Sequence, residues 1–239
     1  MARRGYVNLL QPQDRRSARP GDSSAAVAAR RRFLARGFES ALTRAIGDLL
    51  TLTPADALLE IGCGEGHYLG AFTERFGCAG HGVDLSVPAI EAAAARRAGL
   101  HLVVANADRA LPYADGSFAA VASITARRNP AEFRRVLRDD GRLLLVIPGP
   151  DDLVELREAV LGRGLLRDRV DQAVAAFASR FTLERHERLR HVAPLDAEAI
   201  RDVMTGSYRA GRASRRDRLA ALGPLTVTLS RDALLLRPV

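Results

Sequence analysis

Short apolar runs alternate with segments of helical periodicity through the middle of the chain. Five runs have the length and near-continuous hydrophobicity of parallel strands that are buried on both faces. These expected strands span residues 57–61, 80–84, 100–104, 118–124 and 142–147. Between them, helices are expected over residues 66–76, 87–97 and 130–137. The alternation of strand and helix predicts a doubly wound α/β sheet.

Further elements are expected on both sides of this alternating core. Ser23 or Ser24 can cap a helix that runs to about residue 36, and a second helix is expected over residues 38–50. After the fifth strand we expect helices over residues 152–161, 167–179 and 197–204 and strands over residues 181–192 and 225–236. The last two strands would close one edge of a Rossmann-like seven-stranded sheet, with the short helix inserted between them.

Length and composition exclude several classes of protein. The 239 residues, 47% of them hydrophobic, suffice for one domain with a full core. No apolar run reaches the roughly 18–20 residues that a membrane span needs, and no signal-peptide core follows the first residues. The two cysteines, Cys63 and Cys78, are too few for a disulfide scaffold or an all-cysteine zinc site. We therefore expect a cytoplasmic protein with no membrane partner and no bound metal.

Arginine supplies every basic side chain, and 36 arginines against 28 acids give a net charge of +8. Most of the excess lies in residues 1–50, which hold ten arginines and four acids, whereas residues 51–150 hold ten and eleven. A basic arm ahead of a near-neutral core is expected of a chain that attracts a phosphate backbone. A solvated, solubilising surface accounts for the same charge, so charge alone leaves both interpretations open.

The strongest chemical signal is the turn after the first expected strand, where residues 60–67 read EIGCGEGH. Small residues in this turn let a ligand approach the backbone at the carboxyl edge of the sheet, beside the amides that start the next helix. Asp84 ends the second strand, 18 residues after Gly66, where a carboxylate can bind both hydroxyls of a ribose. Glu60, just ahead of the turn, suits an amine-bearing ligand.

Together these residues resemble motifs I and II of the class I S-adenosylmethionine-dependent methyltransferases. The resemblance implies that the glycine turn contacts the methionine part of the cofactor and that Asp84 holds the ribose. Leu85 would cover one adenine face, and Asn106 or Asp108 would meet the adenine amine. Cys63 is expected to be a small residue beside the cofactor, because the reaction needs no nucleophilic thiol. The implied cofactor-binding residues are Glu60, Gly62, Cys63, Gly64, Gly66, His67, Asp84, Leu85, Asn106 and Asp108.

A narrower resemblance rests on the N-terminal string GYVNLL at residues 5–10 and PGDS at residues 20–23. Further matches lie at residues 126–130, 148–156 and 204–205. These strings are similar to those of the RlmA-type ribosomal RNA guanine-N1 methyltransferases, including the macrolide-resistance branch, and they extend over essentially the whole chain. The resemblance implies S-adenosylmethionine as cofactor and ribosomal RNA, reached through the basic N-terminal arm, as partner.

The resemblance also implies a division of the chain. Residues 1–52 would form the basic arm and the helices that cover the active site, and residues 53–239 would form the methyltransferase domain. Insertions around residues 150–210 would recognise the acceptor. A homodimer is left open.

Three departures from the family pattern lie where the acceptor would be recognised. The family carries a zinc module with four Cys or His ligands ahead of the GYVNLL string, whereas only residues 1–4 precede that string here, so we expect no RNA-reading finger. Where the family has an aromatic residue followed by Ala and Pro, this chain has Thr125-Ala126-Arg127. Asp152 stands where a histidine is usual.

Methylation of a guanine N1 requires alignment of the acceptor, loss of a proton and stabilisation of the charge that develops on the neighbouring oxygen. We expect Arg127 or Arg128 to stabilise this charge, with Asn129 as a hydrogen-bonding alternative. Asp152 is a candidate base by its position, although surface charges and a helix-start acid account for the same residues. The residues expected to line the acceptor pocket are Tyr6, Asn8, Thr125, Asp152 and Tyr208.

Two other functions fit the same cofactor motifs. A methyltransferase for a small secondary metabolite would explain the missing zinc module and the rewritten acceptor loop. A cofactor-binding regulator or cyclase on the same scaffold would transfer no methyl group. Labelled S-adenosylmethionine, offered with ribosomal RNA or with a metabolite extract, separates the three.

The charge of the arm generates a first prediction. Reversing the charges of Arg15, Arg16 and Arg19 together should weaken ribosomal RNA binding and leave S-adenosylmethionine binding unchanged. In a salt titration the wild-type affinity should fall steeply, with a log–log slope roughly proportional to the number of phosphates neutralised, and the triple variant should show a smaller slope. If the wild-type chain binds no RNA at low ionic strength, the arm has no docking role and a small-molecule acceptor is favoured.

Overall fold

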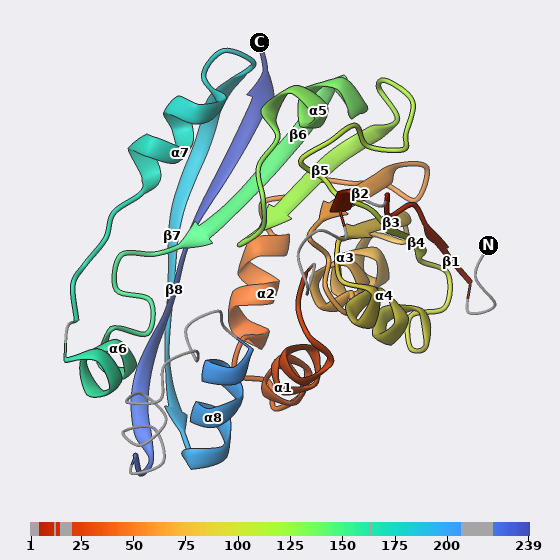
Figure 1. Cartoon of the computed structure of the whole chain (residues 1–239). Coiled ribbons are helices and arrows are strands. Elements are labelled where there is room, and N and C mark those ends of the chain that lie inside the picture. The colour runs from red at the N-terminus through yellow and green to blue at the C-terminus, as the bar shows by residue number, and fades with distance from the viewer. Residues whose placement is uncertain (1–4, 12, 15–20, 163, 207–221) are drawn as a thin grey trace.

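The computed structural model describes residues 5–11, 13–14, 21–162, 164–206 and 222–239. Within these residues, eight strands form one sheet in the order β1-β4-β3-β2-β5-β6-β8-β7 (Figure 1). Strands β1 to β6 pair in parallel, and β8 runs antiparallel to both β6 and β7. The strands are β1 (Tyr6–Asn8), β2 (Ala57–Ile61), β3 (Ala79–Asp84), β4 (His101–Val104), β5 (Phe118–Ile124), β6 (Leu137–Pro148), β7 (Phe181–Leu195) and β8 (Leu225–Pro238).

The helices connect these strands and flank the sheet. They are α1 (Ser24–Ala35), α2 (Ser40–Gly47), α3 (His67–Phe76), α4 (Val87–Ala94), α5 (Pro130–Val136), α6 (Val154–Leu161), α7 (Val170–Phe177) and α8 (Ala197–Thr205). All the expected elements form, with boundaries that shift by a few residues. Ser23 caps α1 by accepting from the Ala26 N–H, and α8 lies between β7 and β8 in the sequence. The expected α/β sheet with two closing strands is therefore confirmed.

The sheet contains one strand more than the seven expected. β1 pairs with the outer edge of β4, with Tyr6 opposite Leu102 and Asn8 opposite Val104. The backbone groups on that edge of β4 gain partners in this way. Three residues are too few to show the alternation by which a strand is recognised from sequence, so periodicity did not reveal this one.

Two apolar cores lie on opposite faces of the sheet. On one face, Phe133 of α5 and Phe177 of α7 belong to the same core as Leu143. On the other face, Phe72 of α3 belongs to the same core as Leu144. Neighbouring residues of β6 thus enter different cores, which is why the strand sequences are apolar without interruption.

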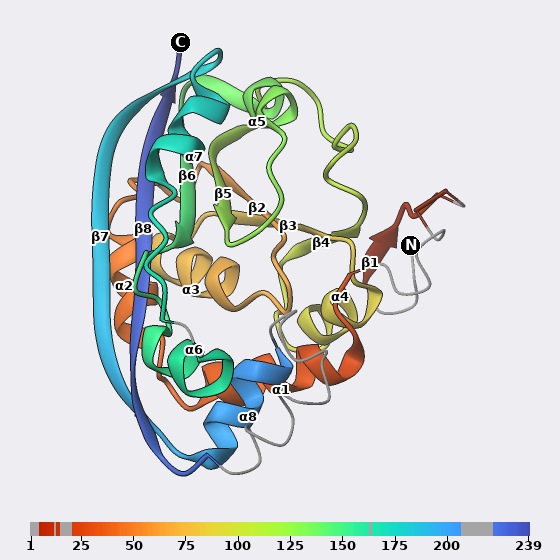
Figure 2. The same cartoon turned by 60° about the vertical axis from the view of Figure 1, so that its left-hand side comes forward.

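A third cluster lies beyond the carboxyl ends of the parallel strands, where β7 and β8 extend toward α1, α6 and α8 (Figure 2). Phe33 of α1 and Leu156 of α6 belong to its buried centre. Arg32 of α1 makes two hydrogen bonds to the buried Asp202 of α8, at 3.1 and 2.5 Å. These contacts place three helices over the edge of the sheet where the glycine turn lies.

None of the helices in the described ranges is long and apolar enough to cross a membrane.

Candidate active site

A cavity of about 950 Å³ lies at the carboxyl edge of the sheet. β2 pairs with β3 on one side and with β5 on the other, so the connections that follow β2 and β5 diverge and leave a crevice between them. Gly62 after β2, Asp84 at the end of β3 and Thr125 after β5 line this cavity. Residues of α1, α6, α8 and β8 line much of the remainder.

The glycine turn has a backbone conformation that other residues rarely adopt. Gly62, Gly64 and Gly66 all have positive φ angles, of 71°, 55° and 75°. A β-carbon on Gly62 would lie 2.4 Å from the Cβ of Ala126, whereas a β-carbon on Gly64 would meet no atom within 4 Å. The backbone of the turn therefore faces open space at Gly64, where a ligand can approach it.

The carboxylate of Asp84 holds this turn in place. Its Oδ2 accepts a hydrogen bond from the Gly64 N–H at 2.9 Å, and its Oδ1 accepts one from the Ser86 N–H at 2.7 Å. Burial raises the pKa of Asp84 above its usual value, although the hydrogen bonds from the two backbone N–H groups lower it. Each carboxylate oxygen keeps further acceptor capacity, so two ribose hydroxyls can be bound from the cavity.

Five of the ten expected cofactor-binding residues line the cavity: Gly62, Gly64, Asp84, Leu85 and Asn106. Cys63 is buried beside Gly82 and does not line the cavity. Gly66 does not line it either, because its α-carbon faces Leu100, which a β-carbon there would meet. His67 Nε2 lies 3.1 Å from Thr43 Oγ1, and burial lowers its pKa.

Glu60 is 1% exposed and is not among the residues that line the cavity. Its Oε2 has no hydrogen-bond partner among the described residues, and burial raises its pKa to about 8. The carboxyl group of Glu60 is therefore buried behind the turn, apart from the residues that line the cavity.

Leu85, Ala105, Asn106 and Ala107 line the part of the cavity where the resemblance places the adenine, which we call the adenine side. Asn106 Nδ2 donates to Asp14 Oδ1 at 3.0 Å, which links this side to the N-terminal segment. Asp108 does not line the cavity and instead pairs with Arg127 at 3.1 Å.

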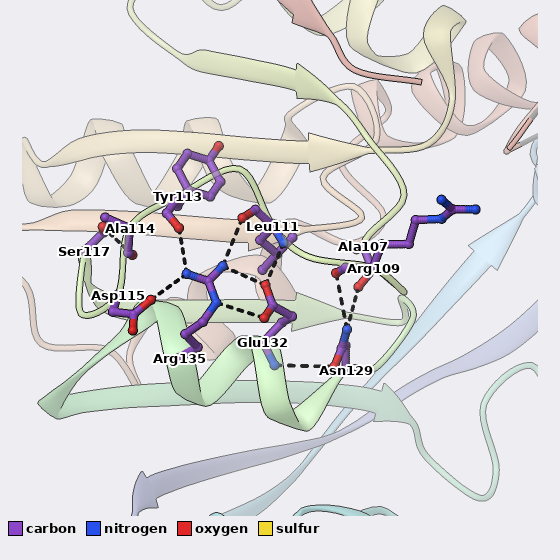
Figure 3. A network of polar contacts seen from close by, with 10 residues as sticks. All are labelled: Ala107, Arg109, Leu111, Tyr113, Ala114, Asp115, Ser117, Asn129, Glu132 and Arg135. Carbon is purple, nitrogen blue, oxygen red and sulfur yellow. Dashed lines mark hydrogen bonds and ion pairs between the residues drawn. The ribbon is translucent and has the colours of Figure 1, made fainter. Parts of the chain in front are cut away.

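The loop that follows the adenine side is fixed to α5 (Figure 3). Arg135 donates to the carbonyl oxygens of Leu111 and Tyr113, at 2.9 and 2.7 Å, and forms ion pairs with Asp115 and Glu132. Asn129 caps α5 and donates from Nδ2 to Ala107 O at 3.2 Å. The segment over residues 111–117, which leads into β5, thus has a structural role, since two of its backbone carbonyls accept hydrogen bonds from Arg135.

An ion cluster lies at the other end of the cavity. Arg231 of β8 donates to Glu39 Oε1 at 2.7 Å and to Asp152 Oδ1 at 2.5 Å. Tyr68 donates to the second oxygen of Glu39 at 2.5 Å. Burial alone would raise the pKa of Glu39, but Arg231 and Tyr68 hold it below its usual value. The same burial would lower the pKa of Arg231, but Glu39 and Asp152 raise it further above its usual range, so the guanidinium stays charged.

The expected acceptor residues lie in several places. Thr125, Arg127 and Asp152 line the cavity, and Arg127 is 78% exposed at its side chain. Tyr6 is buried in β1, with its hydroxyl 3.3 Å from Glu91 Oε1, and Asn8 accepts from the Leu10 N–H. The residues that the structure does not place along the cavity wall are Tyr6, Asn8, Arg128 and Asn129. Tyr208 lies outside the described residues.

Sequence reasoning missed Glu39, Tyr68 and Arg231, all of which line the cavity. One signal was present for Arg231, because the pair Arg231-Asp232 interrupts an otherwise apolar strand near the C-terminus. No local pattern marks Glu39 or Tyr68, since only the packing of α2 against α3 brings them to the cluster.

The strand order, the glycine turn after β2 and the carboxylate at the end of β3 define a class I S-adenosylmethionine-dependent methyltransferase. A family model described as a methyltransferase domain matches residues 58–144. The 23S rRNA (guanine(748)-N(1))-methyltransferase of Streptomyces fradiae is 38% identical over 85% of this chain and 74% of its own length. A relative from Micromonospora griseorubida is 33% identical over 100% of this chain and 87% of its own length. The chain belongs to the family of RlmA-type guanine-N1 methyltransferases.

Other similarities are more distant or cover less of the chain. The nocamycin O-methyltransferase of Saccharothrix syringae is 36% identical over 62% of this chain and 55% of its own length. The YcgJ protein from Bacillus subtilis has the same fold, with a TM-score of 0.60, 18% identity and coverage of 81% of this chain and 96% of its own. This structural likeness supports the fold alone.

The cofactor side generates a prediction for Asp84. Asp84→Ala should weaken S-adenosylmethionine binding at least tenfold, because hydrogen bonds to charged groups contribute about 1.5–3 kcal/mol each. Isothermal titration calorimetry measures the affinity, and circular dichroism shows whether the variant is folded. Asp115→Ala, which removes an exposed carboxylate that is bound to Arg135, is the matched control. Unchanged affinity in folded Asp84→Ala contradicts the ribose role.

The raised pKa of Glu60 generates a prediction about stability. Because the pKa shifts from 4.5 to about 8 on folding, the folded chain holds a proton that the unfolded chain releases over this range. The contribution of this group to the free energy of unfolding is therefore full below pH 4.5 and is lost as the pH rises to about 8. Glu60→Gln should remove that loss, and urea unfolding at a series of pH values measures it. Parallel pH profiles for wild type and Glu60→Gln would contradict the shift.

Proposed function

We propose that the chain transfers a methyl group from S-adenosylmethionine to the N1 atom of a guanine in 23S ribosomal RNA. The observation that carries this proposal is the similarity to the Streptomyces fradiae enzyme, which is 38% identical over 85% of this chain. Such an acceptor places the enzyme in the cytoplasm, with the ribosomes.

The acceptor side of the cavity suits a planar ring. Its apolar lining comes from α1, α6 with its N-cap residue, α8 and β8, and includes Phe33, Leu34, Leu153, Leu156, Val160, Val203, Met204 and Leu229. A single base, turned out of the RNA, can be enclosed by these side chains while its polar edge meets the ion cluster. The lining also keeps water away from the reacting atoms.

Orientation is the main contribution that these residues make to the reaction. Gly62, Gly64, Asp84 and Leu85 would hold the cofactor, which supplies, when bound, a methyl group on a positively charged sulfur. The apolar lining holds the acceptor in line with that methyl group. Asp152, which lines the cavity, is positioned to accept the proton that guanine N1 loses.

The RNA around the target base would be bound by the basic N-terminal arm. Its arginines Arg15, Arg16 and Arg19 lie outside the described residues, and their role rests on the charge of residues 1–50. Asp14, Gly21 and Asp22, which flank this stretch, line the cavity. RNA that is bound to the arm would therefore lie near the opening through which the base enters.

A small-molecule acceptor is the second candidate. The similarity to nocamycin O-methyltransferase and the enclosure of the cavity by three helices favour it. The two candidates differ in the acceptor atom, because an O-methyltransferase methylates an oxygen of a small molecule and the leading proposal requires a ring nitrogen of RNA.

Primer extension tests the leading proposal. The wild-type chain, incubated with S-adenosylmethionine and unmodified 23S ribosomal RNA, should produce one new stop at a guanine, because an N1-methyl group blocks base pairing. Asp84→Ala should produce a weaker stop, and Asp115→Ala should produce the wild-type stop. Transfer of labelled methyl into a metabolite extract, with none into RNA, would overturn the proposal in favour of the small-molecule acceptor.

A further inference from the structure

One donor of the buried Arg231 guanidinium lacks a partner. Its two terminal nitrogens donate to Asp152, to Glu39 and to the carbonyl oxygen of Ser230. Its Nε–H has no hydrogen-bond partner among the described residues, although Arg231 is only 8% exposed. Buried donors are nearly always paired, and Arg231 lines the cavity, so the missing partner is expected to be an acceptor atom of a bound molecule.

We propose that Arg231 is a catalytic residue that binds the carbonyl oxygen beside the methylated nitrogen and stabilises the negative charge that develops on it. This inference rests on the proposed function and narrows the acceptor to one chemical class. The class is a ring in which an N–H adjoins a carbonyl group, as N1–H adjoins O6 in guanine. A hydroxyl acceptor would give Arg231 no such oxygen.

The proton and the electrons balance with the groups on this wall. The ring N–H loses its proton to the Asp152 carboxylate, and the charge that remains is shared between the nitrogen and the carbonyl oxygen. Arg231 donates its Nε–H to that oxygen. The nitrogen lone pair then bonds to the methyl carbon while the carbon–sulfur bond breaks and leaves its electron pair on sulfur as a neutral thioether. Asp152 passes the proton to water.

Arg231 has the burial and the charge that this role requires, whereas the two arginines that the sequence suggested for it, Arg127 and Arg128, do not. Arg127 is 78% exposed at its side chain and already pairs with Asp108. Arg128 does not line the cavity. A hydrogen bond from a charged donor is stronger in a dry, low-dielectric site than at an exposed surface, so Arg231 is the better stabilising group.

Glu39 and Tyr68 act through Arg231 as positioning residues. Glu39 accepts a hydrogen bond from Nη2 of Arg231, and Asp152 accepts one from Nη1. The Tyr68 hydroxyl donates to the second oxygen of Glu39 and so restricts the orientation of that carboxylate. The guanidinium is therefore held from two sides, and its Nε–H keeps one direction.

The chain offers a matched control. Arg188 of β7 also binds two carboxylates, Asp168 at 3.0 Å and Asp232 at 2.9 Å, but it does not line the cavity. Asp232 follows Arg231 in β8, so the ion pair of Arg188 lies next to Arg231 in the same strand. Arg188→Gln thus removes a comparable guanidinium without touching the proposed site.

The test compares Arg231→Gln, Arg231→Lys and Arg188→Gln with the wild-type chain. S-adenosylmethionine affinity, measured by calorimetry, should stay unchanged in all of them, because the cluster lies away from the glycine turn. For a short hairpin that carries the target guanine, kcat should fall about 100-fold in Arg231→Gln. In that variant kcat should continue to rise with pH where the wild type has levelled off, and Arg231→Lys should recover part of the rate.

A binding comparison removes the dependence on rates. The same hairpin with 2-aminopurine in place of the target guanine lacks both the carbonyl oxygen and the N1–H, and the wild-type chain should bind it at least tenfold more weakly. Arg231→Gln should lose the part of this preference that the oxygen supplies, and Arg188→Gln should keep all of it. If Arg231→Gln does not fold, the double variant Arg231→Gln with Glu39→Gln also removes the Glu39 carboxylate, whose charge would otherwise be buried without a partner. The comparison of the two hairpins with the wild-type chain needs no variant.

The outcomes separate this inference from the proposed function. Methylation of guanine N1 by the wild type, with Arg231→Gln equal to it in kcat and in hairpin preference, overturns the role of Arg231 alone. An equal loss of cofactor and hairpin binding in Arg231→Gln shows a structural role and also overturns it. If the wild type methylates no guanine N1, the proposed function fails, and this inference fails with it.

Discussion

A single buried carboxylate, that of Asp84, fixes the geometry of the cofactor side. It accepts from the Gly64 N–H in the glycine turn and from the Ser86 N–H at the start of α4, so it connects the segments that follow β2 and β3. Ser86 in turn donates from Oγ to the backbone oxygen of Asp22, which extends the connection to the segment ahead of α1. The glycine turn, the start of α4 and the segment ahead of α1 therefore depend on one side chain, whose burial is compensated by backbone donors.

The acceptor side is organised by charge instead of by turns. Glu39, Asp152 and Arg231 come from the N-terminal helices, from the segment after β6 and from the last strand, and they meet at one point. A buried ion group of this kind adds little net stability, because desolvation offsets the attraction between its members. Its value lies in direction: carboxylates on both sides restrict the orientation of the guanidinium. This arrangement suits a site that must distinguish one edge of a ring from another.

The sequence was most informative where a local pattern carries the structure. The glycine turn and Asp84 could be found because glycine at positive φ and a carboxylate at a strand end are local requirements. Glu39 and Tyr68 could not be found, because their meeting depends on the packing of two helices against the sheet. The strand β1 could not be predicted for a third reason, since its three residues pair with a strand almost a hundred positions away in the sequence. Hydrophobic periodicity reveals only elements long enough for the alternation of apolar and polar residues to repeat.

The close approach of Gly62 to Ala126 couples the sizes of the residues on the two sides of the cavity. Because a β-carbon on Gly62 would lie 2.4 Å from that of Ala126, neither position can enlarge unless the other backbone moves. Thr125 and Arg127, on either side of Ala126, line the cavity without this restriction. The acceptor loop can thus exchange its outer residues to suit a new acceptor, while the cofactor turn sets the size limit at its centre.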